Sequence, residues 1–401
     1  MKQREGRKAS RVLGAAIGVQ FFSGILYVWS IFKDHLIARY QWTDAEATIP
    51  YTIANIVFAL SMFMAGLILP KTSARLMITV GTGMLGLGLV LSAFAITPWM
   101  WVITMGFIVS AGIGINNLVA TPAAICWYPP SKRGSIIGLV VAGVAIAPVM
   151  YSPLTSFLFK TVGLTWGSIV LGLLVFLIPL PLAQLIASPP DDFIPAGTST
   201  DKAADSSNTE VSCRQMIRKP EFYKLFVMFA FSASAGLILF GHLTRIVRLQ
   251  ANWEGGFFLL MLLAVFNAAG RFMGGAASDR MGNAALLRLV FLSQAINFAL
   301  FGFHRSPWTL GLGVAIAGIC YGAILSVFPV LTADYFGTKH LGANYGLMFL
   351  AWGIGGVLGP QIAGSVFDAT GSYQKAYWLA VALLIAASLV TFTLKEKKSA
   401  T

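Results

Sequence analysis

Residues Leu263–Gly282, LAVFNAAGRFMGGAASDRMG, place one arginine, Arg271, inside an otherwise apolar helical segment. The stretch ends in the pattern Gly275-x-x-x-Asp-Arg-x-Gly282. A guanidinium inside a helix that crosses the hydrocarbon layer is costly unless it faces a partner or a wet cavity. The stretch therefore predicts a membrane-spanning helix and, within it, a functional site.

The overall composition favours a membrane protein. Of the 401 residues, 57% are hydrophobic and only 11% are charged, whereas soluble domains carry about 25% charged residues. The net charge of +13 lies in short loops between apolar runs, without a basic stripe beside stacking aromatics, so nucleic acid is not a predicted partner. The three cysteines lie far apart and predict no metal site or disulfide.

Apolar segments long enough to cross a bilayer recur twelve times along the chain. We expect helices at about 11–33, 48–69, 75–97, 99–127, 133–158, 165–187, 223–249, 254–278, 284–304, 307–335, 340–367 and 374–395. The predicted fold class is an all-α polytopic membrane protein with two six-helix bundles, 1–187 and 223–401. Residues 188–222 are rich in Pro, Ser, Thr and Asp and predict a cytoplasmic linker.

The distribution of basic residues predicts the orientation. If both termini are cytoplasmic, the loops and termini on that side hold most of the 28 Lys and Arg, as the positive-inside rule requires. The first apolar run is long enough to be a retained helix rather than a cleaved signal. Short loops fit a bacterial inner membrane, with the lipid bilayer as the partner of the outer surface.

The two halves repeat. The runs Gly66–Lys71 and Gly275–Arg280 each follow the second helix of their half, and Trp127–Gly138 matches Tyr335–Gly346 after the fourth. Two similar six-helix units in parallel orientation are typical of transporters that bind substrate between the units near the membrane midplane.

These features resemble the major facilitator superfamily. The second-half pattern that contains Asp279 and Arg280 is similar to that family's loop signature, which implies a conformational role for Gly275, Asp279, Arg280 and Gly282. The first-half copy is degraded, with Pro70 where the acid should be.

Arg271 is the leading binding candidate. Eight residues separate it from Asp279 at the expected interface, which is about 12 Å of helix, so Arg271 lies close to the midplane of a core about 30 Å thick. Its planar fork suits a carboxylate held by two hydrogen bonds. The alternative is a structural arginine paired with backbone carbonyls. Arg271 is the one Lys or Arg not assigned to a loop or helix end, and no Asp or Glu is expected mid-helix, so an anionic substrate would supply its counter-charge.

Other polar residues in the spans are further candidates. Asn267, one turn before Arg271, is expected either to orient the guanidinium, to contact substrate, or to join two helices. The superfamily resemblance implies that helices one, four, seven and ten line the cavity. Tyr27 is expected either to contact substrate or to be an interfacial aromatic, and Trp352 either to wall the cavity or to face lipid. Residues that would either contact substrate or form packing hydrogen bonds are Asn116, Asn117 and Tyr321. His242, in the outer part of the seventh helix, is either a proton carrier or an interfacial residue without a role.

Several motifs resemble the monocarboxylate transporters and the oxalate–formate antiporters. They are Ser23-Gly-x-x-Tyr-x-Trp-Ser30, Trp127-Tyr-Pro-x-x-Lys-Arg-Gly134, Asn344-Tyr-Gly346, and an arginine four residues after a polar residue in helix eight. The resemblance implies that Arg271 holds the substrate carboxylate. In two places the chain departs from these families. Asn267 replaces the aspartate of the animal proton-coupled carriers, and Trp352 replaces the antiporter's second cation, a lysine.

One midplane cation predicts a substrate with one carboxylate. We expect alternating-access transport of a small monocarboxylate such as lactate or pyruvate, with a proton carried by His242 or by the bound acid. The alternative is carboxylate exchange of the oxalate–formate type. The sequence shows no nucleotide-binding loop or catalytic constellation, so neither an enzyme nor a cofactor is predicted, and no obligate protein partner is inferred.

Overall fold

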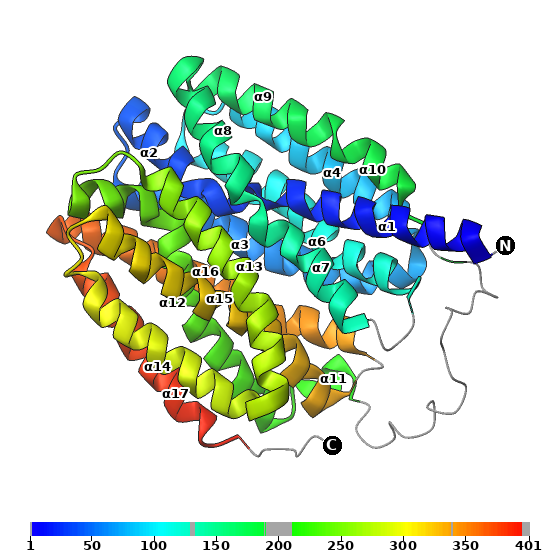
Figure 1. Ribbon diagram of the computed structural model, residues 1–401. Helices are drawn as coiled ribbons and strands as arrows, with labels where there is room; N and C mark the ends of the chain where they lie inside the picture. Colours follow the sequence, from blue (N-terminus) through cyan, green and yellow to red (C-terminus); the bar gives the residue numbers. More distant parts are fainter. Residues whose placement is uncertain (1, 129–132, 188, 190–210, 338–339, 395–401) are drawn as a thin grey trace.

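The computed structural model describes residues 2–128, 133–187, 189, 211–337 and 340–394, and these form helices joined by short connections (Figure 1). Within these residues, twelve helices are long and apolar enough to cross a membrane. The predicted class, an all-α protein with twelve spans, is confirmed. Most of the expected linker, 190–210, and parts of both repeated loops, 129–132 and 338–339, lie outside the described residues.

The first half comprises six spans, several of which are built from two or more helical pieces. The elements are α1 (Lys2–Phe22), η1 (Ser23–Val28), α2 (Trp29–Tyr40), α3 (Asp44–Ile68), η2 (Leu69–Lys71), α4 (Ala74–Ser92), α5 (Pro98–Trp101), η3 (Val102–Val109), α6 (Ser110–Ile125), α7 (Arg133–Ile146), α8 (Pro148–Thr161), α9 (Gly163–Leu177) and α10 (Pro179–Leu185). The breaks before α8 and α10 coincide with Pro148 and Pro179, because proline has no backbone N–H to continue a helix.

The second half has longer, continuous helices. The elements are α11 (Cys213–Met216), α12 (Pro220–Ala251), α13 (Gly256–Met281), α14 (Asn283–Phe301), α15 (Pro307–Phe336), α16 (Leu341–Thr370) and α17 (Gln374–Thr391). In Figure 1 this half, green to red, lies beside the blue-to-green first half, and α3 and α16 pack together where the halves meet.

The first two spans extend further than the sequence indicated. The first span continues through α2 to Tyr40 instead of ending at 33, and α3 begins at Asp44 instead of 48. A capping box, in which Thr43 and Glu46 bond each other's backbone N–H, starts α3 at this earlier position. We name the end of the molecule that holds the connections 41–43, 252–255 and 371–373 the far end; it lies opposite the end at which α1 begins (Figure 1).

Glycines let α13 and α15 approach closely. A Cβ added to Gly318 or Gly322 of α15 would clash with the backbone of Leu263 or Asn267, and one added to Gly270 of α13 would clash with the carbonyl of Ile319. This close packing holds the helix that carries Arg271 in place.

Replacement of Gly322 by alanine is therefore expected to destabilise the fold. The added methyl would meet the backbone of both Asn267 and Arg271, and overpacking of this kind costs about 1–3 kcal/mol. Gly275→Ala on α13 is the matched control because nothing lies within 4 Å of its added Cβ. Thermal unfolding in detergent should show a lower Tm for Gly322→Ala alone, and equal Tm values for the two variants would contradict this packing account.

Candidate functional site

Arg271 links the two halves of the molecule. Its Nη1 donates to the Val141 carbonyl oxygen on α7 at 3.1 Å, and its Nε donates to Asn267 Oδ1 at 3.4 Å. Among the described residues, no carboxylate forms an ion pair with it. Arg271 is thus a cation at the interface of the halves whose protein partners are neutral.

Asn267 serves as an orienting group for this guanidinium. It is fully buried, and its amide oxygen faces the Nε of Arg271. Within the described part of the chain, its amide nitrogen is buried without a hydrogen-bond partner. A buried donor without a partner is costly, and this one lies one helical turn from the guanidinium.

Tyrosine side chains surround Arg271. Tyr27, Tyr321 and Tyr345 all lie close enough to interact electrostatically with its charge. The hydroxyl of Tyr321 accepts a hydrogen bond of 2.7 Å from Trp352 Nε1. The structure thus brings together four residues that the sequence singled out, Arg271, Tyr27, Tyr321 and Trp352, and adds Tyr345.

A small cavity lies between the halves next to this cluster. Its lining residues are Ser23, Leu26, Tyr27, Tyr51, Asn55, Phe58, Ile113, Val144 and Trp352. The free space is about that of one water molecule. Tyr27 belongs both to the cavity wall and to the surroundings of Arg271, and so connects the two.

The two asparagines of α6 bond residues of the first half. Asn116 is buried within the first half, where its Nδ2 donates to Ser23 Oγ at 3.2 Å and to Thr82 Oγ1 at 3.4 Å. The backbone carbonyl of Asn117 accepts from Gln20. These bonds join helices, and substrate contact by either asparagine stays a prediction.

The loop motif is only partly visible. Gly275 lies within α13, and Gly282 ends that helix with φ +81°, a conformation that glycine adopts without strain. The side chains of Asp279 and Arg280 lie outside the described part, so their conformational role stays a prediction.

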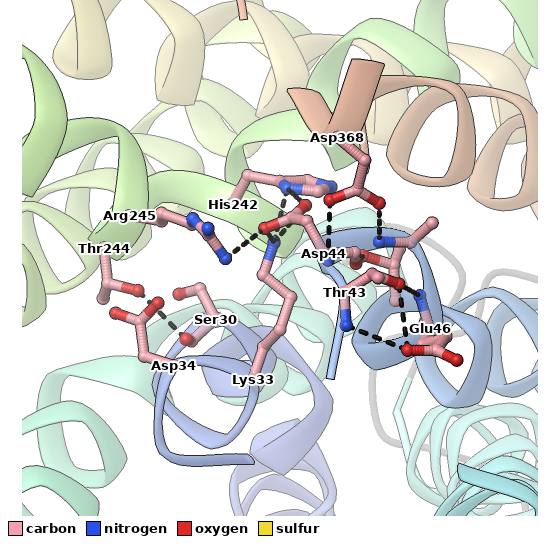
Figure 2. A network of polar contacts seen from close by, with 12 residues as sticks. Ser30, Lys33, Asp34, Thr43, Asp44, Glu46, His242, Thr244, Arg245 and Asp368 are labelled. Atoms are coloured by element: carbon pink, nitrogen blue, oxygen red, sulfur yellow. Dashed lines mark hydrogen bonds and ion pairs between the residues drawn. The ribbon is translucent and has the colours of Figure 1, made fainter. Parts of the chain in front are cut away.

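A second polar cluster, the far-end network, lies where α2, α3, α12 and α16 meet (Figure 2). At its centre, Lys33 Nζ donates to both oxygens of Asp44 at 3.2 and 3.3 Å, and both side chains are 0% exposed. This corrects the sequence-based inference that Arg271 is the single basic residue away from loops and helix ends. Because the first two spans extend further than predicted, Lys33 and Asp44 are buried inside the bundle.

His242 of α12 joins this network from the other half. Its Nδ1 contacts Lys33 Nζ directly and lies 3.1 Å from Asp44 Oδ2 and 3.0 Å from the Tyr373 hydroxyl. Its Nε2 lies 2.9 Å from the Pro360 carbonyl oxygen. His242 is thus buried in contact with three ionisable side chains.

Further contacts close the far end across the halves. Arg245 Nη1 lies 2.8 Å from Asp44 Oδ1, and the carboxylate of Asp368 accepts the backbone N–H groups of Asp44 and Ala45 at 2.8 and 2.7 Å. Asp368, from α16, thereby caps the first turn of α3, where an anion is favoured by the helix dipole. Burial raises the pKa of the Tyr373 hydroxyl well above its usual range, so this residue is a neutral donor to Asp44 (3.2 Å).

The far-end network could not be predicted from local sequence patterns because its members are distant in sequence. Lys33 and His242, for example, are 209 positions apart. One local signal was present: Thr43 and Glu46 form a T-x-x-E capping box, which predicts a helix start at Asp44. No local pattern in the sequence pointed to Tyr345.

Two six-helix halves around a polar site define a membrane transporter, and the comparisons with known proteins agree. The profile of the Major Facilitator Superfamily matches residues 12–303 and 258–401, so the chain belongs to this superfamily. The chain is 23% identical over 381 residues to the oxalate:formate antiporter of Oxalobacter formigenes, covering 93% of this chain and 88% of the relative. It is 24% identical over 390 residues to monocarboxylate transporter 13 of Rattus norvegicus, covering 96% and 88%.

A solved structure shares the fold. A bacterial homologue of the human lysosomal transporter Spinster, in an inward-facing and occupied conformation, superposes with a TM-score of 0.75 at 17% identity and covers 96% of each chain. Among the described residues, no group of three His, Cys, Asp or Glu is placed to hold a metal ion.

We expect removal of the Asp44 charge to destabilise the closed far end. Asp44→Asn leaves the buried Lys33 and the partly buried Arg245 against a neutral amide, and loss of one partner from a buried ion pair costs roughly 3–5 kcal/mol. Glu254→Gln is the matched control, because Glu254 pairs with Arg248 on the surface, with its side chain 71% exposed, and such pairs contribute at most about 1 kcal/mol. Chemical or thermal unfolding should show a lower stability for Asp44→Asn alone. Equal stability of both variants and the parent protein would contradict this expectation.

Proposed function

We propose that this protein is a secondary transporter of small monocarboxylates such as lactate or pyruvate, which it moves by alternating access together with a proton. The observation that carries the proposal is the position of Arg271, which is half-buried at the interface of the halves and has no carboxylate partner among the described residues. A guanidinium has five N–H donors, and the structure gives Arg271 hydrogen bonds to one carbonyl and one amide oxygen.

An arriving carboxylate would be a stronger partner than the carbonyl of Val141. Charge-assisted bonds are roughly twice as strong as bonds to neutral acceptors, and a carboxylate can take both prongs of the guanidinium. The Val141 contact joins α13 to α7 across the halves. Substrate that replaces this contact would neutralise Arg271 and release one link between the halves, which is the coupling that alternating access needs.

The surroundings favour a small acid with one charge. The cavity beside Arg271 is walled mainly by aromatic and aliphatic side chains, and Trp352 takes the place where the sequence comparison expects a second cation. A second carboxylate would therefore lie against an indole. Relatives named as a monocarboxylate transporter and an oxalate:formate antiporter support a carboxylate as the substrate class.

We place the protein in a bacterial inner membrane with both termini in the cytoplasm, so that the far end faces outward. The support is the excess of Lys and Arg in the loops on the side of the termini. In this orientation the far-end network closes the outer side.

The second candidate function is carboxylate exchange. It is favoured by the similarity to the oxalate:formate antiporter. It is also favoured by Asn267, because an amide cannot take up a proton, whereas an aspartate at this position could. In exchange, the binding site returns to the first side of the membrane with a second anion on Arg271. In symport, a proton is released together with the substrate, and the site returns empty.

The binding site is tested by titrating purified protein with L-lactate. Arg271→Ala should raise the Kd at least about 100-fold and Arg271→Lys about 10-fold, because hydrogen bonds to charged groups are worth about 1.5–3 kcal/mol each. Arg288→Lys is the control, since Arg288 bonds Thr391 far from α7. Unchanged affinity in both Arg271 variants would refute the assignment.

Coupling is tested in liposomes loaded without internal anion. Symport predicts that an inward proton gradient accelerates uptake of labelled L-lactate several-fold. Exchange predicts negligible uptake until unlabelled carboxylate is placed inside. Gradient-independent uptake in the absence of internal anion would reject proton symport, and strict dependence on internal carboxylate would establish the exchanger.

A further inference from the structure

We propose that His242 is a proton-operated latch: binding of a second proton to its imidazole and closure of the far end exclude each other. Acid on the far side then opens the transporter toward that side. This inference deepens the transport cycle proposed above and rests on it for its biological meaning, but the latch itself stands on the contacts of the far-end network.

The position of the first proton on His242 follows from its neighbours. Nε2 lies 2.9 Å from the Pro360 carbonyl oxygen, which can only accept a hydrogen bond, so Nε2 carries a proton. A neutral imidazole has one N–H, and Nδ1 then presents its lone pair. Nδ1 is the atom where a second proton would bind.

Nδ1 is in contact with Lys33 Nζ. Two nitrogens form a hydrogen bond only if one of them offers a lone pair. In the closed structure Lys33 therefore donates to a neutral His242. The Nδ1 of His242 also lies 3.0 Å from the Tyr373 hydroxyl and 3.1 Å from Asp44 Oδ2, the carboxylate to which Lys33 and Tyr373 already donate. An ammonium and an imidazolium cannot make this contact. In the closed state, Lys33 and His242 together therefore carry one positive charge rather than two.

The remaining charges do not leave room for another cation. Lys33 of α2, Asp44 of α3 and Tyr373 before α17 contact His242, and Arg245 of α12 and Asp368 of α16 contact Asp44 beside it. The two cations are matched by the two carboxylates, and Asp34 nearby is paired with Arg248. An imidazolium would be an unmatched third cation beside Lys33, where both side chains are 0% exposed and water does not screen the repulsion.

The contact that forbids the second proton spans the two halves. Lys33 and Asp44 belong to the first half, and His242 and Tyr373 to the second. When the far end opens, the two nitrogens separate and each can hold its own proton. A solvated imidazole takes up a proton near pH 6.5.

The sign of the pH effect follows from linkage. The closed state binds fewer protons than the open state, so falling pH favours the open state. One proton gives at most a tenfold change in the open-to-closed ratio for each pH unit below about 6.5, and no change well above it. Acid outside would thus open the far end of the transporter toward the side from which a monocarboxylate and a proton enter together.

The latch is tested by measuring opening directly, without substrate. We suggest spin labels at Val162 and Phe303, which are 48% and 68% exposed, lie at the far end of opposite halves and have no part in the network. The background replaces Cys126, Cys213 and Cys320. Double electron–electron resonance in lipid nanodiscs between pH 8 and pH 5 should show a growing long-distance population, with the ratio of long to short distances rising at most about tenfold per pH unit below about 6.5.

Three variants assign the response to the network. His242→Gln should hold a constant open fraction at all pH values. Lys33→Met should reverse the trend, because without the ammonium an imidazolium pairs with Asp44, and acid then favours closure. His35→Gln is the matched control, since His35 also lies on α2 but bonds the Ile31 carbonyl and packs on Phe159, and it should respond like the parent.

The result that overturns the latch is a pH response that is absent from the parent or that persists unchanged in His242→Gln. The distance distribution at pH 8 shows whether each variant is folded and closed. The outcome is separable from the transport proposal. If the parent opens in acid but does not bind lactate, the substrate assignment is wrong and the latch stands. If lactate transport depends on Arg271 but acid does not open the far end, the latch is wrong and the substrate assignment stands.

Discussion

A cation inside a membrane protein needs a counter-charge, and two basic residues at the interface of the halves, the buried Lys33 and the half-buried Arg271, meet this requirement in different ways. Lys33 is matched within the protein by Asp44, at 3.2 Å and without solvent exposure. Arg271 has neutral partners, Val141 and Asn267. We infer that the matched cation closes one end of the molecule and that the unmatched cation receives the substrate, because only the latter gains strongly from an incoming anion.

The two sites would act in sequence. The far-end network joins the halves at one end, through Asp44 on one side and His242, Arg245 and Asp368 on the other. Arg271 joins them nearer the middle through the Val141 carbonyl. In the cycle that we propose, a proton on His242 loosens the first connection and a carboxylate on Arg271 replaces the second. The proton and the substrate then promote the same motion from two different residues. Such a mechanism would not need an acidic side chain at position 267, where this chain has Asn267.

The fold could be predicted from the sequence because hydrocarbon thickness sets the length of an apolar helix, and each long apolar run became a span. The prominence of Arg271 was also predictable, since a charge inside such a run stands out. What local patterns could not show is contact between distant segments. Lys33 was assigned to a helix end, and Asp44 to a loop, until α2 and α3 were seen to extend. The partners of His242 come from elements separated by more than a hundred residues, and Tyr345 of α16 approaches Arg271 of α13 only through the packing of helices that are distant in sequence.

The account depends most directly on where the substrate carboxylate binds. A structure of the protein with bound L-lactate, determined by crystallography or electron microscopy, answers this in one measurement. We predict both carboxylate oxygens within about 3 Å of the Arg271 guanidinium nitrogens, with the Val141 contact broken. A carboxylate bound instead to Lys33 or Arg245 in the far-end network, or at a site away from Arg271, would contradict the central claim.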